Sequence, residues 1–271
     1  NKQLVKKVKD ILVYHRFQPR RTKLATSFCN NTDRRVLEKD LCSAFGRTHI
    51  AMGGTAGFAF GGLTSFLEMA RSSKDCLIVY GPHIGVDETG IVPESSVLGC
   101  EAYSKAVKRV LQAYGDSKGS EEKKVQDEED VEASTAPSPS EVDLYEEGLV
   151  DRLLMPFCKR LDESKGDAME LAMVAFDAQD ELMQSIVMAG CQQVQVSGQI
   201  AMLGGIQVHT PEKTQDYFLP LKFDLLDSKG KLVEHLLWRA ESSGNNPNKK
   251  RRRRLSHRQP QPSQRRTPQI A

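Results

Sequence analysis

Cys76-Leu77-Ile78-Val79-Tyr80-Gly81-Pro82-His83 is the stretch of this chain that says most about its architecture. It begins with a short apolar run, and Gly81-Pro82 closes that run with a turn. Such a run is typical of a strand that is buried on both faces of a parallel sheet. Segments before and after it place apolar residues three or four positions apart, which indicates helices. Strands separated by helices favour an α/β fold, with a mostly parallel central sheet flanked by helices.

The elements around this strand can be outlined from the same patterns. We expect helices over residues 1–22, 32–45, 95–114, 149–161 and 168–190, and a small-residue helix that ends near residue 70. Asn31 or Thr32 can cap the helix over residues 32–45. Two strands over residues 200–209 and 217–226, followed by a turn and a last strand over 232–237, give the fold a C-terminal strand pair.

Composition divides the chain into one domain and two polar segments. Residues 115–148 contain few large apolar groups and many acidic ones, so we expect an acidic disordered insertion there. Residues 242–271 are polar, basic and rich in proline, and we expect a disordered tail. Residues 23–114 and 149–241 then form the two halves of a single domain, which a basic helix over residues 1–22 precedes.

The overall composition excludes several classes of protein. The 271 residues are 39% hydrophobic, which is enough for a packed core, and the net charge of +2 favours no particular partner. Six cysteines without paired spacings do not indicate a disulfide framework, so we expect reduced thiols in a cytosolic or plastid-like compartment. No apolar run reaches the roughly 20 residues that a membrane-spanning helix needs, so a membrane is not an expected partner.

Cys29, His83 and Cys100 form the most informative chemical group, although they lie far apart in the sequence. Two thiolates and one imidazole can hold a zinc ion and leave its fourth position open, which is the arrangement of a catalytic zinc. A lone cysteine is more often a small buried hydrophobic residue. We assign that role to the four other cysteines: Cys42, Cys76, Cys158 and Cys191.

Four segments resemble the limiting-CO2-inducible protein B/C family, whose members are described as theta-type or beta-carbonic-anhydrase-like. The resemblance implies a beta-carbonic-anhydrase-like α/β fold and reversible hydration of CO2 to bicarbonate. It also implies that Cys29, His83 and Cys100 hold zinc, and it places residues 23–114 as the half of the domain that supplies these ligands. The four segments span residues 29–46, 48–62, 81–90 with 99–100, and 203–209 continued by 217–221.

The residues that follow Cys29 depart from this family. The family pattern Cys-x-Asp pairs a carboxylate with an arginine, but Asn31 stands at the aspartate position. An amide can accept a hydrogen bond from water, yet it carries no charge and cannot act as a base. Asp33 could replace the missing carboxylate if the loop shifts, and Arg35 is the candidate arginine, with Arg34 as the second choice. The resemblance thus implies that Asn31 or Asp33, together with Arg35, would orient water, and that turnover is weakened.

Three further residues are candidates for the pocket. His49 could lie near the pocket, or it could bond a backbone carbonyl. His209 ends an apolar strand and could face the site from the second half of the domain. Asp87 could accept a hydrogen bond from the ring of His83, as metal-bound imidazoles commonly require, or it could be a turn residue before Gly90.

Gly53-Gly54-Thr55-Ala56-Gly57 is a glycine-rich segment without the Lys-Ser/Thr ending of a phosphate-binding loop. The spacing of its glycines does not match a dinucleotide-binding motif either. We interpret it as backbone that packs close to the pocket and could donate N–H groups to an anion such as bicarbonate.

Three functions therefore remain open. The first is a zinc carbonic anhydrase that acts on CO2 and bicarbonate in inorganic carbon concentration. The second, favoured by Asn31, is a catalytically impaired zinc-binding homologue that acts as an assembly or bicarbonate-sensing partner. The third, a nucleic-acid binder, rests only on the basic residues 249–266, which have no interleaved aromatic residue for base stacking. By resemblance we expect a homodimer and a chloroplast location, with the cytoplasm as the alternative; no N-terminal targeting segment is visible.

Overall fold

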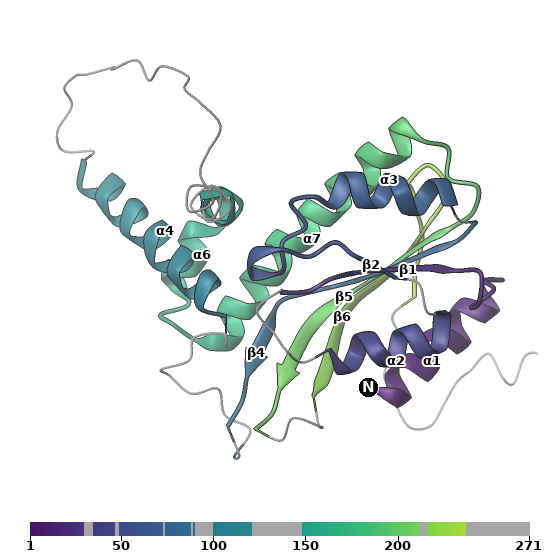
Figure 1. The fold of residues 1–271 in the computed structure, drawn as a ribbon. Coiled ribbons are helices and arrows are strands. Elements are labelled where there is room, and N and C mark those ends of the chain that lie inside the picture. The colour runs from purple at the N-terminus through teal and green to yellow at the C-terminus, as the bar shows by residue number, and fades with distance from the viewer. Residues whose placement is uncertain are drawn as a thin grey trace, which may run out of the picture. The chain divides into compact units, whose positions relative to one another are not determined.

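Seven strands of the described chain form one sheet at the centre of the fold (Figure 1). The computed structural model describes residues 1–29, 35–46, 49–72, 74–87, 89, 100–120, 148–211 and 216–236. The order in the sheet is β2-β1-β3-β5-β6-β7, and β4 pairs with β5 beside this path. The strands are β1 (Lys23–Ser27), β2 (His49–Ala51), β3 (Cys76–Tyr80), β4 (His83–Gly85), β5 (Ile200–His209), β6 (Tyr217–Leu226) and β7 (Leu232–His235).

The sheet changes direction only at its C-terminal strands. Strands β1 to β5 pair in parallel, and β6 and β7 add to β5 in antiparallel pairs. Parallel neighbours require long crossover connections, and helices supply them here. The turn over residues 227–231 is short enough to join the antiparallel strands β6 and β7 directly. The α/β fold with a mostly parallel sheet and a C-terminal antiparallel addition is therefore confirmed.

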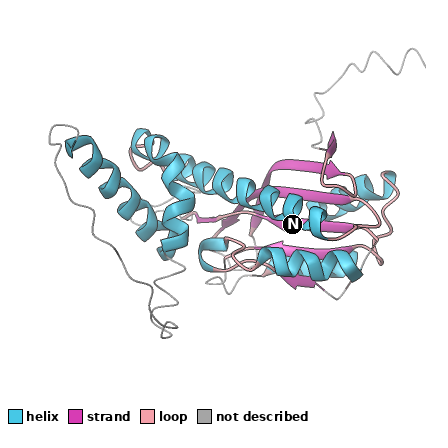
Figure 2. Ribbon diagram, turned by 90° about the horizontal axis from the view of Figure 1, so that it is seen from above, coloured by secondary structure: helices cyan, strands magenta, loops and turns pink. Residues whose placement is uncertain are grey.

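Helices cover both faces of the sheet. Figure 1 shows α1 (Lys2–Tyr14) and α2 (Val36–Phe45) on one face, and α3 (Gly62–Ser72) and α7 (Ala168–Gln193) on the other. A second group of helices lies beyond one end of the strands (Figure 2), and it includes α4 (Glu101–Ser120) and α6 (Cys158–Glu163). Short 3-10 turns are η1 (Thr55–Gly57) and η2 (Met155–Phe157), and residues 148–154 are also helical.

Strand β3 is at the centre of the hydrophobic core. All of its side chains are buried, and Cys76, Ile78 and Tyr80 pack with residues of α3 and α7 in one apolar cluster. A second cluster joins α4 and α7 with the ends of β4 and β5. Burial on both faces explains why this run of sequence has no polar alternation.

Several predicted elements have the predicted limits, and others differ. Strands β3, β5 and β6 begin and end where the sequence pattern placed them. Helix α2 begins at Val36 instead of residue 32, and α4 continues through residues 115–120 of the predicted insertion. Residues 121–147 of that insertion, the helix caps at Asn31 and Thr32, residues 95–99 and the basic tail lie outside the described residues. Among the described helices, none is both long and apolar enough to cross a membrane.

Strands β1, β2 and β4 were not predicted. Strand β1 contains Thr26 and Ser27, which are polar but buried. The Thr26 hydroxyl donates to Glu38 at 2.7 Å and the Ser27 hydroxyl to the Gly57 carbonyl at 2.9 Å. Because these bonds satisfy both hydroxyls, the strand can be central without being apolar. Strands β2 and β4 have only three residues each, too few for a period to be recognised.

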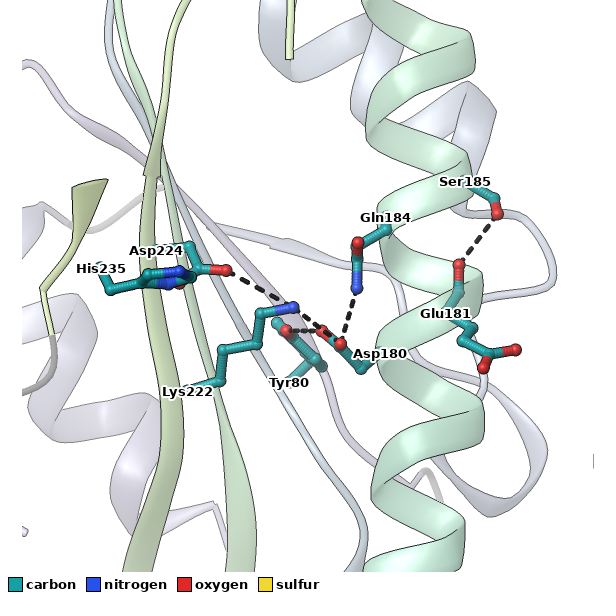
Figure 3. A network of polar contacts seen from close by, with 8 residues as sticks. All are labelled: Tyr80, Asp180, Glu181, Gln184, Ser185, Lys222, Asp224 and His235. Carbon is teal, nitrogen blue, oxygen red and sulfur yellow. Dashed lines mark hydrogen bonds and ion pairs between the residues drawn. The ribbon is translucent and has the colours of Figure 1, made fainter. Parts of the chain in front are cut away.

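A network of polar side chains connects the sheet with α7 (Figure 3). The Asp180 carboxylate accepts a short hydrogen bond from the Tyr80 hydroxyl and a bond of 2.8 Å from Lys222 Nζ. Lys222 Nζ also lies 3.4 Å from Asp224, whose other oxygen is 2.7 Å from His235 Nδ1. Burial, followed by the charge and hydrogen bond of Asp180, raises the pKa of Tyr80. This network fastens β6 to β3 and α7.

We expect the substitution Asp180→Ala to lower the free energy of unfolding by about 2–4 kcal/mol, because it leaves Tyr80 and Lys222 without their main partner. Urea unfolding measures the change. Glu181→Ala is the matched control on the same helix; Glu181 is exposed, so its loss should change stability by at most about 0.5 kcal/mol. Equal effects of the two substitutions would show that the network contributes little to stability.

Candidate metal-binding site

Three buried side chains converge at the carboxyl ends of the central strands. Cys29 follows β1, His83 begins β4 just after β3, and Cys100 precedes α4. Their ligand atoms all lie within 4.8 Å of one another, and the two sulfur atoms are 3.7 Å apart. Ligand atoms that lie about 2.0–2.3 Å from one tetrahedral zinc ion are separated from one another by distances similar to these. The carboxyl edge of a parallel sheet is also where α/β proteins commonly bind ligands.

The glycine-rich segment sets the backbone position of Cys29. Gly53 packs so closely on Phe28 that a Cβ atom at Gly53 would lie 2.1 Å from the Phe28 carbonyl oxygen. Only glycine allows this approach. The Ser27 hydroxyl also donates to the carbonyl of Gly57. The prediction that this segment is backbone packed beside the pocket agrees with these contacts.

Strand β4 places His83. The peptide of Gly81 turns the chain after β3, with its N–H bonded to the Ser27 carbonyl at 3.3 Å. The Pro82 carbonyl then accepts a bond of 2.8 Å from the Gln207 N–H, and His83 pairs with Gln207 in the parallel register of β4 and β5. Backbone pairing on two sides therefore fixes the segment that carries the imidazole.

Cys100 lies at the N-terminus of α4. The hydrogen bond with Cys29, followed by burial, raises the pKa of its thiol. The backbone N–H groups of Tyr103 and Ala102 donate to the sulfur and oppose part of this rise. The Tyr103 hydroxyl donates to the Leu171 carbonyl at 2.9 Å, which ties this end of α4 to α7.

The donor set suits a metal ion. His83 is only 5% exposed, and neither of its ring nitrogens has a hydrogen-bond partner among the described residues. A buried imidazole without partners is costly, and a bound cation would remove that cost. A dication would also favour the thiolate forms of the two neighbouring cysteines. The Cys-His-Cys cluster can therefore bind a metal.

His209 is the pocket candidate that the structure brings to this site. Its ring meets the His83 ring edge to face, with centroids 5.1 Å apart. On its other side, His209 Nδ1 lies 3.3 Å from the buried carboxylate of Asp216. Asp216 also lines a cavity of about 710 Å³, together with the start of α1, the first turns of α2, and residues 217–218. The structure thus brings His209, from the second half of the domain, beside His83.

The other predicted site residues have different surroundings. Asp87 accepts hydrogen bonds from the backbone N–H and the hydroxyl of Thr89, at 2.8 and 2.6 Å, so it has the turn geometry that the sequence also allowed. His49 begins β2, and its Nε2 atom lies 3.9 Å from Glu38. Arg35 precedes α2, and its guanidinium lies 3.5 Å from the same carboxylate. Asn31, Asp33 and Arg34 lie outside the described residues.

Two buried polar residues near these groups were missed in the sequence. Glu38 is 7% exposed. Its carboxylate accepts a hydrogen bond from Thr26 and lies near Arg35 and His49. Gln207 is 5% exposed and is the register partner of His83. Glu38 lies on the apolar side of a predicted helix, one residue after Leu37, and this irregularity could have revealed it.

Comparison with known proteins gives a consistent result. A family model described as limiting CO2-inducible proteins B/C beta carbonic anhydrases matches residues 1–227. The crystal structure of PtLCIB4, a homologue of the limiting CO2-inducible protein LCIB, is similar with a TM-score of 0.70 and 31% sequence identity, over 87% of this chain and 93% of that chain. A mutant of PtLCIB4 has a TM-score of 0.69 and 31% identity, over 86% of this chain and 90% of its own.

The crystal structure of LCIB itself is a more distant match. Its TM-score is 0.55 at 18% identity, over 86% of this chain and 91% of that chain, so the likeness concerns the fold alone. The comparison with curated proteins found no match.

Proposed function

The chain belongs to the family of limiting CO2-inducible proteins B/C beta carbonic anhydrases, and on this premise we propose that it hydrates CO2 reversibly to bicarbonate with zinc held by Cys29, His83 and Cys100. The observation that carries the proposal is the convergence of these three buried donors around an imidazole that has no other partner. Zinc, when bound, polarises water and lowers its pKa to about 7, which makes water a nucleophile at neutral pH.

The residues around the cluster suit a small neutral substrate. Cys29 and Cys100 belong to an apolar cluster that also contains Phe58, Ile84 and Ile206. An apolar wall limits the access of bulk water and offers CO2 a favourable environment. The ionic group of Glu38 lies on α2, where it pairs with Arg35 just before α2 and lies near His49 of β2. By family resemblance, Asn31 or Asp33 would orient the attacking water.

The direct test is to purify the chain, measure its zinc content, and follow CO2 hydration by stopped flow. We expect bound zinc and a hydration rate above the uncatalysed reaction. A chain that retains no zinc at micromolar concentrations of the metal, with its fold intact, would contradict the proposal.

Asn31→Asp tests the departure from the family pattern. A carboxylate at this position can accept a proton from water, whereas the amide cannot, and general bases commonly contribute about 10²–10⁴-fold to a rate. We therefore expect the substitution to raise kcat for CO2 hydration at least about tenfold at unchanged zinc content. Asn30→Asp, on the neighbouring residue, is the control for the added charge. An unchanged rate in Asn31→Asp would show that Asp33 or another group already supplies the base.

Asn31 also favours a second candidate function. A chain that holds zinc but turns over slowly could act as an assembly partner or a bicarbonate sensor. This alternative predicts that the unaltered chain binds zinc and bicarbonate but does not hydrate CO2. It also predicts that Asn31→Asp restores hydration.

By resemblance to the family, we further propose that the chain acts in concentrating inorganic carbon, as a homodimer in the chloroplast. Light scattering on the purified chain tests the dimer, because a monomer would give half the expected mass. Cell fractionation of the full-length protein tests the compartment.

A further inference from the structure

Gln207 is a buried amide beside the candidate metal site that the proposed mechanism does not use. The residue is 5% exposed, and its Nε2 group has no hydrogen-bond partner among the described residues. Its backbone is fully engaged, because its N–H donates to the Pro82 carbonyl at 2.8 Å and the residue lies in the middle of paired strands. The side chain alone is left with an unused donor.

The strand register gives the direction of this side chain. Gln207 pairs with His83 on β4 and with Phe218 on β6, and paired residues project from the same face of a sheet. His209, two positions along β5, projects from that face as well, and its ring contacts the His83 ring. The amide is therefore a neighbour of the imidazole on one face.

Gln207 also has an apolar neighbour on this face, Phe218. Phe218 is 7% exposed, and its ring contacts the Phe28 ring with centroids 6.4 Å apart. Phe28 directly precedes the ligand Cys29. An unpartnered amide donor beside these rings and the His83 imidazole is a polar group that can orient a small ligand by one hydrogen bond.

A second buried glutamine shows what a structural amide does in this protein. Gln179 on α7 is 3% exposed, and its Nε2 group donates to the Ala56 carbonyl at 2.9 Å. Its donor thus holds a turn in place. A buried donor that is left without such a partner, as in Gln207, lowers stability and calls for a functional explanation.

We propose that Gln207 Nε2 donates a hydrogen bond to an oxygen atom of bicarbonate or CO2 and so orients it beside His83. A neutral amide suits this task, because it recognises an oxygen acceptor in either molecule without trapping the anion by charge. This inference rests on the proposed function, since it assigns a binding residue to the same site.

The test compares the zinc-loaded chain with its Gln207→Leu variant. Thermal unfolding is followed with increasing sodium bicarbonate, at an ionic strength kept constant with sodium chloride. Without bicarbonate, we expect the variant to unfold at the same or a higher temperature, because an unpartnered buried donor has been removed. The bicarbonate concentration for half of the stabilisation should rise about tenfold or more, the usual effect of losing one hydrogen bond to a charged group.

Gln179→Leu is the matched control. Losing its bond to Ala56 should lower the unfolding temperature and leave the half-saturating bicarbonate concentration within about twofold of the original. Gln207→Met repeats the test with an unbranched side chain, in case leucine does not fit the strand. A folded Gln207 variant with an intact bicarbonate response overturns the proposal, and so does the absence of any response in the unaltered chain.

Kinetics separates this inference from the proposed function. In a chain that hydrates CO2, the Gln207 variants should raise KM more than they lower kcat. If the unaltered chain has no turnover but its bicarbonate response depends on Gln207, the enzymatic proposal fails and the binding residue stands. If turnover is present and neither KM nor the bicarbonate response changes in the variants, the role of Gln207 is refuted alone.

Discussion

Replacing His83 with alanine is expected to remove nearly all bound zinc and to reduce CO2 hydration to the uncatalysed rate. His83 is the only nitrogen donor in the described cluster, and the two sulfur atoms of Cys29 and Cys100 would remain with two vacant positions on the ion. A catalytic zinc with three protein ligands depends on each of them. Inductively coupled plasma mass spectrometry measures the zinc, and stopped flow the rate.

The fold should survive this substitution. His83 makes no side-chain hydrogen bond in the described part of the chain, so its loss leaves no partner unsatisfied. His235→Ala is the matched control, because this exposed histidine pairs with Asp224 (Figure 3) and belongs to β7, the last strand in the order of the sheet. It should retain zinc and activity. If folded His83→Ala protein still bound one zinc ion per chain, His83 would not be a zinc ligand.

The parts of this fold that could be predicted are the strands and helices whose own residues show a clear apolar pattern. Strand β3 was predicted with its observed limits because its buried faces leave a continuous apolar run. Strands β5 and β6 are long enough for their apolar character to dominate. Helix α7 likewise has apolar residues at helical spacing over many turns, and it begins at the predicted Ala168.

The parts that could not be predicted depend on partners. Thr26 looks like a loop residue until Glu38 of α2 is known to accept its hydroxyl hydrogen bond. Strand β4 consists of three residues whose extended form is fixed by pairing with β5. No local pattern contains that information, because the partner is more than a hundred residues away.

The site shows the same division. Cys29, His83 and Cys100 could be selected by their chemistry and by the family resemblance, and their convergence agrees with that selection. Gln207 carried no such signal, because a glutamine in an apolar strand can point to either face. Only the register with His83 shows that its amide faces the same space.

Gly81 connects β3 to the candidate metal ligand His83. We expect Gly81→Ala to lower the stability of the fold severely. A Cβ atom at Gly81 would lie 1.6 Å from the carbonyl oxygen of Gly205, and the residue has a φ of +153°, which alanine rarely adopts. Backbone cannot move aside as a flexible side chain can. We expect a loss of more than about 3 kcal/mol of unfolding free energy, the range of severe packing and strain defects.

The damage should also reach the metal. Separating Gly81 from Gly205 pulls β4 away from β5, and His83 is two residues from the clash. The fraction of Gly81→Ala protein that folds should therefore bind less zinc per chain than the original.

Gly85→Ala, at the other end of β4, provides the comparison that makes this test sharp. A Cβ atom there meets nothing within 4 Å, so alanine should fit and can even add about 0.4–1 kcal/mol by restricting the unfolded chain. Urea unfolding and zinc analysis on both variants measure the difference. If Gly81→Ala were as stable as Gly85→Ala and bound as much zinc, the close contact between Gly81 and Gly205 would not be needed to position His83.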